Sequence, residues 1–439
     1  MDLSDLSSIR IAAADMNGIL RGKRMPSDLA EKLSDGTARM PLSTLNVDLF
    51  GRDVEESELV FKTGDADGVL KPTERGPLPM PWLDTPSALF PMMMYNEDGS
   101  AFDGDPRHAL IHTLQQFTHR GWQVWAATEM EFYLVDDSSG HLAPPINPTT
   151  GQRLDQQAVL SLEELDAFDA FFSDLYAAAE EMGIPAQSAI SEGGLGQFEI
   201  NLNHQLALRA ADDALLFKGL VRGLARKHGF AATFMAKPYG EEAGNGMHVH
   251  FSIVDKDGRN VFDDGGEAGT SLLRHAVGGC VAAMPASTLI FAPHGNSYER
   301  FTPGAHAPTK AAWGYENRTA AIRIPGGNPA ARRIEHRVAG GDINPYLLLT
   351  AILGAALIGI EDKMIPPPAI GGNTYEEKGL PRLAATWENA VDLFECDPLI
   401  ARIFPTQIIQ NLVMMKRQEI KTFAALPAQN HWRTWLDLV

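Results

Sequence analysis

Residues 123–135 are a candidate cation-binding segment, because they carry acidic residues at alternate positions. The segment is apolar and β-branched and lies between Gly121 and the turn-forming residues 136–140, which predicts a β-strand. Because side chains of a strand alternate between its faces, Glu129 and Glu131 project the same way, about 7 Å apart along the chain. Two carboxylates on one apolar face repel each other unless a cation holds them. The alternative is a solvated edge strand whose outer face is acidic.

Three further segments carry residues that bind divalent cations or phosphate. In Glu192-Gly-Gly-Leu-Gly196-Gln-Phe-Glu199 three glycines allow the chain to double back, so that both carboxylates can approach one point. A His-x-His pair alone more often packs than binds a metal, and a run of arginines is usually a solvated or phosphate-facing edge. The other candidates lie on two more predicted strands. One face of the first carries His248, His250 and Ser252, and one face of the second carries Arg333, Glu335 and Arg337.

Together the four segments supply five carboxylates and one or two histidines, which suit two hard divalent cations such as Mg²⁺ or Mn²⁺. The neighbouring arginines would then face an anionic, phosphate-bearing ligand. Paired cations and arginines are typical of phosphoryl transfer, where catalysis consists mainly of positioning and charge neutralisation. The chain has neither a Walker lysine motif nor a kinase glycine loop, so this would be a different kind of nucleotide site.

The elements that must position these residues follow one another without regular β-α-β alternation, which predicts an α+β fold. Residues 9–25 are expected to form a hairpin with Asn17-Gly18 as a two-residue turn, followed by a small, mainly β unit. Asp105-Pro106 begins a helix, so we place a domain boundary near residue 103. Further strands are predicted at residues 186–190, 197–203, 233–237, 247–254, 320–324 and 332–338, and helices at 161–183, 209–228, 269–284 and 346–360.

Composition narrows the class of partner. The chain has 37 basic and 56 acidic residues and a net charge of −19, which argues against nucleic acid or an anionic membrane as a partner. Two cysteines indicate a reducing compartment, and no signal peptide is evident, so a cytoplasmic location is expected. The longest apolar run is shorter than the roughly 20 residues that a bilayer crossing requires.

The chain resembles the glutamine synthetase family over nearly all of its length, because the motifs of that family occur in order. They are Asp15-x-x-Gly18-x-x-Arg21-Gly22-Lys23, Glu129-x-Glu131-Phe132, Glu192 with Gly196-Gln197-x-Glu199, Gly246-Met247-His248-x-His250, Asn296-Ser297-Tyr298-x-Arg300, Asn317-Arg318 with Arg323-Ile324-Pro325, Arg333-x-Glu335-x-Arg337 and Asn344-Pro345-Tyr346. The resemblance implies an N-terminal β-grasp domain (1–102) and a large α/β catalytic domain (103–439) with a curved antiparallel sheet. It also implies ATP, two or three Mg²⁺ or Mn²⁺ ions per active site, and a dodecamer of two hexameric rings.

The resemblance further implies a role for each matching residue. The implied metal ligands are Glu131, Glu192 and Glu199 beside the acceptor carboxylate, and Glu129, His248 and Glu335 beside the nucleotide phosphates. The implied ligand contacts are His250, Ser252 and Arg333 to the nucleotide, Arg318 and Arg323 to the transferred phosphoryl group, and Gly244, Arg300 and Arg337 to glutamate.

Departures from the ammonia-using pattern concern the second substrate. In glutamine synthetases a flap glutamate closes the site and takes a proton from ammonium, whereas the loop 303–308 carries His306 at this position. A histidine supplies no fixed negative charge, although when neutral it can accept a proton; alternatively, it merely sits on the flap. Ala243 also replaces an asparagine that is usual near glutamate.

Other stretches are most similar to the γ-glutamylpolyamine (γ-glutamylputrescine) synthetase branch, which also lacks the flap glutamate. Among them are residues 15–24, 197–202, 231–238 and 337–340. Asp48 aligns approximately with the aspartate that the family sends across the subunit interface toward the amine, although an ordinary turn acid is the alternative.

The implied function is ATP-dependent joining of the γ-carboxylate of glutamate to a primary amine, putrescine or another polyamine, through γ-glutamyl phosphate. The alternatives are a glutamine synthetase with His306 as substitute base, and a ligase for another small amine such as methylamine or ethanolamine. A catalytically silent ring is a third, but a scaffold has no physical reason to keep all six metal ligands.

Overall fold

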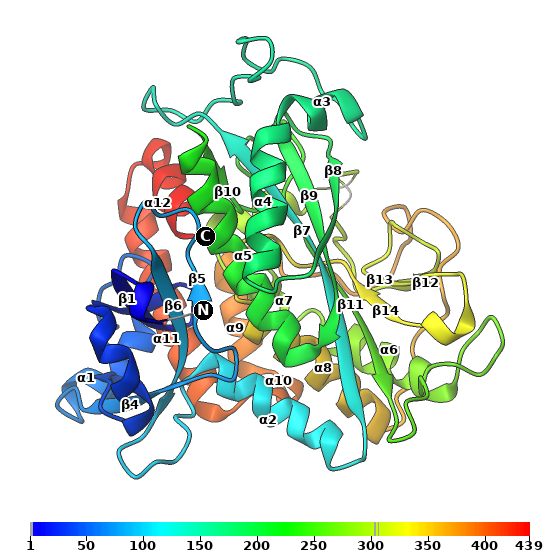
Figure 1. Cartoon of the computed structure of the whole chain (residues 1–439). Helices are drawn as coiled ribbons and strands as arrows, with labels where there is room; N and C mark the ends of the chain where they lie inside the picture. The colour runs from blue at the N-terminus through cyan, green and yellow to red at the C-terminus, as the bar shows by residue number, and fades with distance from the viewer. Residues whose placement is uncertain (1–2, 303, 306) are drawn as a thin grey trace.

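The chain folds into two β-sheets with helices packed between and around them (Figure 1), as the computed structural model shows for residues 3–302, 304–305 and 307–439. The smaller sheet has the order β2-β1-β6-β4-β3, with β5 paired to β6 and with β1 parallel to β6. Its strands are β1 (Ser8–Ala14), β2 (Leu20–Met25), β3 (Arg39–Pro41), β4 (Asp67–Pro72), β5 (Leu78–Pro79) and β6 (Ser87–Tyr95).

The hairpin between β1 and β2 has a wider turn than predicted. Ala14 pairs with Leu20, so five residues, 15–19, form the loop, and a two-residue Asn17-Gly18 turn is wrong. The Asp15 carboxylate stabilises the wider loop by accepting the N–H groups of Asn17 and Ile19, both at 2.9 Å. Gly18 alone has a positive φ, of 76°, among the described loop residues.

The larger sheet has eight strands in the order β12-β13-β14-β11-β7-β9-β8, with β10 paired to one end of β7. All of its pairs are antiparallel except β12 with β13, which confirms the predicted α+β fold with a largely antiparallel sheet. Its strands are β7 (Gln123–Val135), β8 (Ala186–Ser191), β9 (Gln197–Leu206), β10 (Ala231–Thr233), β11 (Met247–Val254), β12 (Trp313–Tyr315), β13 (Ile322–Ile324) and β14 (Ile334–His336).

The strand predicted at residues 233–237 is wrong, because β10 ends at Thr233. Beyond this residue the backbone is bonded to side chains. The N–H of Met235 donates to the Thr233 hydroxyl at 3.2 Å, and the N–H of Lys237 donates to the Asn296 side chain at 2.9 Å. These bonds replace the sheet ladder that the apolar composition of the segment had suggested.

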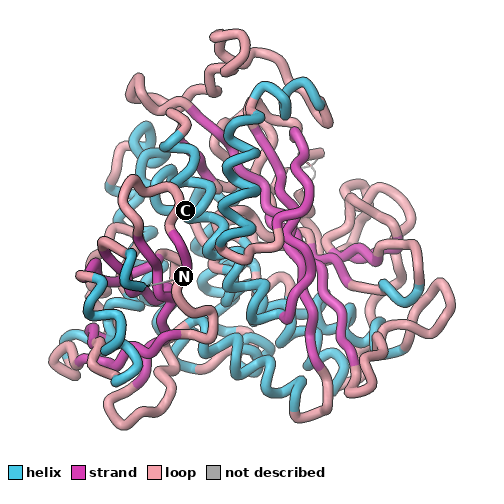
Figure 2. The backbone as a smooth tube through the Cα atoms, in the orientation of Figure 1, coloured by secondary structure: helices cyan, strands magenta, loops and turns pink. Residues whose placement is uncertain are grey.

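Helices cover one face of the larger sheet and fill the space between the two sheets (Figures 1 and 2). The predicted apolar helix is α8, which begins at Pro345 after an Asn344 cap and is buried through Ile360. The helices are α1 (Glu58–Phe61), α2 (Pro106–Thr118), α3 (Leu162–Ala167), α4 (Asp169–Glu181), α5 (Ala207–Lys227), α6 (Ser271–Ala283), α7 (Thr288–Phe291), α8 (Pro345–Glu361), α9 (Trp387–Cys396), α10 (Pro398–Ile403), α11 (Thr406–Ala425) and α12 (His431–Leu438). Short 3₁₀ turns lie at Leu3–Asp5, Ser27–Asp35, Leu42–Asn46, Gly295–Arg300, Pro329–Ala331 and Ala428–Asn430.

The single helix predicted at 161–183 is interrupted. Ser161 caps α3 as expected by accepting the N–H of Glu164, but Phe168 takes a non-helical conformation (φ −104°, ψ 20°) before α4 begins. The Phe168 ring is buried, and its centroid lies 5.3 Å from that of Phe198 and 5.5 Å from that of Phe230. We attribute the break to this packing, which the capping signals do not encode.

Strand β7 has one apolar face and one acidic face. Met130 and Phe132 are fully buried in the core, and α5 packs against this strand. Glu129 and Glu131, on the opposite face, are partly exposed. The strand thus obeys the period of two that its sequence predicted, and it lies in the interior of the sheet. The solvated-edge alternative is therefore wrong.

None of the helices in the described part of the chain combines the length and the apolar character that crossing a bilayer requires.

Candidate active site

The register of the larger sheet brings the predicted segments together. Glu129 on β7 pairs with His248 on β11, and Glu131 pairs with Glu199 on β9. On the far side of β11, His250 pairs with Glu335 on β14. Directly opposed residues of an antiparallel pair have Cβ atoms about 5 Å apart and share a face of the sheet. The convergence of acidic groups therefore follows from strand pairing.

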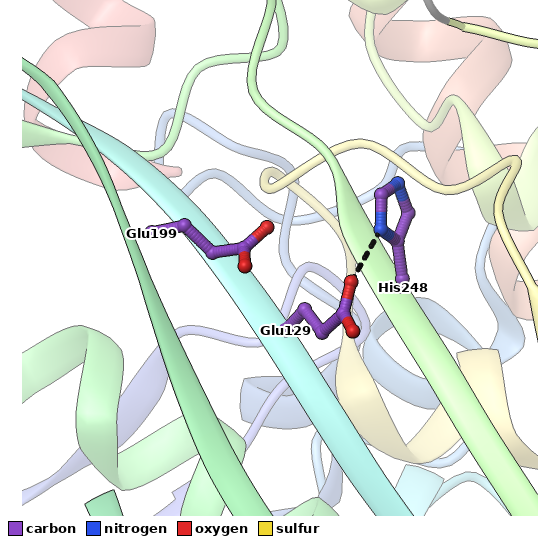
Figure 3. Close-up of side chains that lie close together, drawn as sticks. All are labelled: Glu129, Glu199 and His248. Atoms are coloured by element: carbon purple, nitrogen blue, oxygen red, sulfur yellow. Dashed lines mark hydrogen bonds and ion pairs between the residues drawn. The ribbon is translucent and has the colours of Figure 1, made fainter. Parts of the chain in front are cut away.

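Seven carboxylate and imidazole side chains form three overlapping groups, in each of which the ligand atoms lie within 4.8 Å of one another. Figure 3 shows the Glu129, Glu199 and His248 group facing a common point. The groups are Glu131 with Glu192 and Glu199, Glu129 with Glu199 and His248, and Glu129 with His250 and Glu335. Carboxylates with an occasional imidazole are the donors that Mg²⁺ and Mn²⁺ take, so these residues fit divalent cations.

The grouping differs in part from the expected ligand sets. The first group is the set expected beside the acceptor carboxylate. In the other expected set, His248 and Glu335 fall into different groups, and His250 stands beside Glu335 instead. The cross-strand register explains this, because His250 and not His248 is directly opposite Glu335. The groups overlap, because Glu129 and Glu199 each belong to two of the three.

Glu129 is the residue that connects the two histidines. Its two carboxylate oxygens lie 2.8 Å from Nδ1 of His248 and 2.8 Å from Nε2 of His250. Nε of Arg333 donates to Nδ1 of His250 at 3.1 Å, so Nε2 of His250 carries the proton that Glu129 accepts. Burial would raise the pKa of Glu129, but the two histidine bonds hold this pKa well below its usual range. Glu129 is therefore ionised at neutral pH.

Glu199 and Glu192 have the opposite electrostatic surroundings. Burial and the charges of Glu129, Glu131 and Glu192 raise the pKa of Glu199 to about 9. Burial and the charge of Glu131 raise the pKa of Glu192 to about 7. Carboxylates with raised pKa values hold protons where a cation would otherwise balance their charge.

We expect Mn²⁺ binding to release protons, since a carboxylate must be ionised to act as a ligand. With Glu199 titrating near pH 9, Mn²⁺ affinity should rise about tenfold per pH unit between pH 7 and 9, and more steeply below pH 7, where Glu192 is also protonated. Calorimetric titration in two buffers of different ionisation enthalpy measures the protons released. A flat affinity between pH 7 and 9 would contradict the assignment, and Glu199→Gln should remove the rise in this range.

A buried network of arginines borders the acidic groups. Glu335 is fully buried and accepts bonds from Arg323, at 2.8 Å, and from Arg337. Burial opposes its ionisation, but the charge of Arg337 lowers its pKa below the usual value. Arg300 is also buried and donates to the carbonyl of Val338 at 2.7 Å. The arrangement places three cationic groups beside the carboxylates.

Gly244 occupies a position with no room for a side chain. A Cβ at this residue would lie 2.5 Å from the carbonyl oxygen of Ala236 and 2.9 Å from Cγ of Arg300. The close packing against Arg300 is what a contact shared with glutamate would require, although the role itself stays a prediction. Arg318 is exposed, and its charge acts to lower the pKa of Glu192.

A cavity of ≈ 550 Å³ opens beside the third group. The predicted nucleotide residues His250, Ser252 and Arg333 line it together with Glu129. Trp125, Asn201 and Asn260 also line it, and sequence reasoning missed all three. A cavity of this size, with imidazole and guanidinium groups beside carboxylates, suits a phosphate-bearing ligand whose charge is neutralised by cations.

Two amide side chains support the carboxylates, a role that was not predicted for either, although Gln197 belongs to a motif named above. Asn201 donates to Glu199 at 3.1 Å, and Gln197 donates to Glu131 at 3.4 Å and to the carbonyl of Gly244 at 3.1 Å. The period of two along β9 could have found them, because Gln197, Glu199 and Asn201 share one face of that strand.

Asp48 lies outside the acidic groups of the larger sheet. It is fully buried, and its carboxylate accepts the N–H groups of Phe50 at 3.0 Å and Arg52 at 2.9 Å and the Gln418 amide at 2.9 Å. These are the bonds of a turn acid, the alternative considered for this residue, and a role toward the amine stays a prediction. His306 lies outside the described residues.

These features define a class of protein, an enzyme that positions a phosphate-bearing ligand with divalent cations and arginines on an antiparallel sheet. Residues 103–435 match the family model described as glutamine synthetase, catalytic domain. The protein belongs to this family and is an ATP-dependent, C–N bond-forming glutamate–amine ligase.

Relatives and solved structures support this membership. The chain is 41% identical to gamma-glutamylputrescine synthetase of Escherichia coli (strain K12), over 85% of this chain and 80% of the relative. It is 32% identical to a glutamate–isopropylamine ligase of a Pseudomonas species, over 99% of this chain and 96% of the relative. The solved structure of GmaS in complex with ADP is similar with a TM-score of 0.84 and 26% identity, covering 99% of this chain and 97% of that one.

Proposed function

We propose that this ligase joins the γ-carboxylate of glutamate to putrescine or a similar primary amine, through γ-glutamyl phosphate. The observation that carries the proposal is the set of three overlapping carboxylate and histidine groups beside a ≈ 550 Å³ cavity, combined with a flap that carries His306 in place of glutamate. The similarity to a γ-glutamylputrescine synthetase at 41% identity favours a diamine as the second substrate.

Each group has a proposed task. The three groups would hold divalent cations, which would neutralise charge at the phosphates of ATP and at the acceptor carboxylate. Arg300 and Arg337 hold glutamate beside Gly244, and Arg318 and Arg323 neutralise the transferred phosphoryl group. His250, Ser252 and Arg333 hold the nucleotide, which is supported by the ADP bound to the similar GmaS structure. His306 is proposed to accept the proton that the amine loses.

Larger-scale features are part of the same proposal. We assign residues 1–102 to a β-grasp domain, since β1 and β6 are parallel neighbours in the middle of the smaller sheet, and residues 103–439 to the catalytic domain. The family membership supports a dodecamer of two hexameric rings and a cytoplasmic location. The choice between Mg²⁺ and Mn²⁺ and the number of ions, two or three, belong to the proposal as well.

The test measures phosphate release from ATP in the presence of glutamate and each of a panel of amines. At equal concentration, release should be faster with putrescine than with ammonium. The physical reason is that the flap supplies no fixed negative charge to attract ammonium. Faster turnover with ammonium would overturn the polyamine assignment. His306→Glu is the discriminating variant, because it should raise the ammonium rate at least several-fold if the flap sets the choice.

Glutamine synthesis from ammonium is the second candidate, favoured by the description of the matching family model. Methylamine and ethanolamine belong in the same panel, because a preference for either would keep the ligase chemistry and change only the amine. A protein that releases no phosphate with any amine, and whose melting temperature is unaffected by Mn²⁺, would fit the silent-ring alternative.

A further inference from the structure

Three large apolar side chains are exposed to solvent within four residues, just before and at the start of α3. Val159 is 59% exposed, Leu160 is 70% exposed and Leu162 is 73% exposed. Single exposed apolar residues are ordinary, but a contiguous group indicates a binding surface. The group lies beside the end of β8 (Figure 1), the strand that leads into Glu192.

Backbone and side-chain bonds anchor this segment next to a proposed metal ligand. The N–H of Leu160 donates to the carbonyl of Ser191 at 2.8 Å, and the Ser191 hydroxyl donates to the carbonyl of Ala158 at 2.8 Å. Ser191 directly precedes Glu192 in the chain. The apolar surface is therefore fixed at the acceptor side of the site.

Ala243 is a further apolar residue near this surface, on the other side of Gly193 from Val159. A Cβ at Gly193 would lie 3.8 Å from Cγ2 of Val159 and 3.8 Å from Cβ of Ala243. Val159 and Ala243 therefore flank the backbone that follows Glu192. Ala243 precedes Gly244, the residue proposed to contact glutamate, so the apolar surface extends toward that substrate. An asparagine at position 243 would make this part of the surface polar.

Leu160 holds a backbone conformation that a leucine rarely adopts. Its φ is +58°, in the left-handed region, where a residue with a branched side chain is strained. Such strain persists at binding sites when the surrounding structure imposes it. The bond from the N–H of Leu160 to Ser191 fixes this backbone next to the residue that precedes Glu192, and the leucine side chain is exposed.

A carboxylate lies beside this apolar surface. Oε2 of Glu242 accepts a bond from Nε2 of Gln157 at 2.9 Å, which ties Glu242 to the same segment two residues before Val159. A diamine with a short hydrocarbon chain needs this combination, namely carboxylates at the reacting end, apolar contacts along the methylenes and a second carboxylate for the distal ammonium.

We propose that Val159, Leu160 and Ala243 contact the methylene chain of the amine substrate, and that Glu242 binds the distal ammonium of a diamine. This inference rests on the proposed function and names the substrate class as a linear α,ω-diamine. Burial of one methylene changes an equilibrium about fourfold, so kcat/KM should rise about fourfold per methylene from methylamine to butylamine.

The first test removes the apolar surface while preserving the backbone. Asparagine tolerates the left-handed region, so Leu160→Asn combined with Val159→Ser keeps the loop and removes its apolar contacts. The ratio of kcat/KM for butylamine to that for methylamine should fall at least about tenfold. The matched control is Ile365→Asn, which changes an 87% exposed isoleucine away from the segment and should leave the ratio unchanged. An unchanged ratio in the double variant, or a change only in oligomeric state, would overturn the proposal.

The second test isolates the carboxylate. Putrescine and butylamine both have four carbons and differ in that the distal methyl of butylamine is replaced by an aminomethyl group, so their kcat/KM ratio reports binding of the distal ammonium. Glu242→Gln can still accept the bond from Gln157, and it should lower this ratio about tenfold, which corresponds to about 1.4 kcal/mol. An equal ratio in variant and wild type would overturn the role of Glu242. If amines stimulate phosphate release but the rate does not change with their chain length, this inference alone is wrong. If no amine stimulates phosphate release, the proposed function is wrong.

Discussion

Glu129→Gln should abolish nearly all phosphate release, with a fall in kcat of about a thousandfold, or about 4 kcal/mol in the barrier. Glu129 belongs to two of the three groups that fit a cation, and it is bonded to both histidines. Glutamine keeps the size of the side chain but removes the charge that two cations would share. The loss should therefore exceed that from any ligand that belongs to one group only.

The measurement is single-turnover phosphate release with saturating ATP and glutamate. The matched control is Glu181→Gln, which removes a charge at the exposed end of α4 and should leave kcat unchanged. Mn²⁺ should raise the melting temperature of the wild type more than that of Glu129→Gln, because binding to the native state stabilises it. A variant that keeps kcat within tenfold of wild type would show that Glu129 does not hold the cations.

The acidic face of β7 was predictable from local rules alone. A period of two, with Met130 and Phe132 on one face and Glu129 and Glu131 on the other, fixes what each side of the strand contacts. The effect of the glycine loop between Glu192 and Glu199 was also predictable, since these two carboxylates cluster with Glu131 as expected. These features depend on neighbours in the chain and on strand geometry.

The partition of ligands among the groups was not predictable in the same way. Which of His248 and His250 stands beside Glu335 depends on the register between β11 and β14, strands that 79 residues separate in the sequence. A shift of that pairing by two residues would place His248 there and keep the same faces buried. The break at Phe168 has the same origin, because the ring packs on Phe198 and Phe230, which are distant in the sequence. The wide hairpin loop is different, because the Asp15 bonds that stabilise it are local and compete with the two-residue turn signal.

Glu335→Gln is expected to reduce the stability of the protein as well as its activity. Glu335 is fully buried and is the carboxylate that both Arg323 and Arg337 contact, so the variant leaves the buried Arg337 and the largely buried Arg323 beside a neutral amide. Breaking a buried ion pair by neutralising one partner costs about 3–5 kcal/mol. Activity should fall as well, because the same carboxylate belongs to a cation group with Glu129 and His250.

Glu316→Gln is the matched control, because Glu316 contacts the same Arg323 at 3.3 Å but its side chain is 59% exposed. An exposed pair contributes at most about 1 kcal/mol, so urea midpoints at one fixed protein concentration should separate the two variants clearly. The pKa of Glu335 is lowered, so its stabilisation is present above the unfolded pKa near 4.5 and is lost as pH falls through the folded value. The difference between wild type and Glu335→Gln should therefore be full at pH 7 and shrink in acid. Equal midpoints at pH 7 would mean that solvent, and not Glu335, compensates the two arginines.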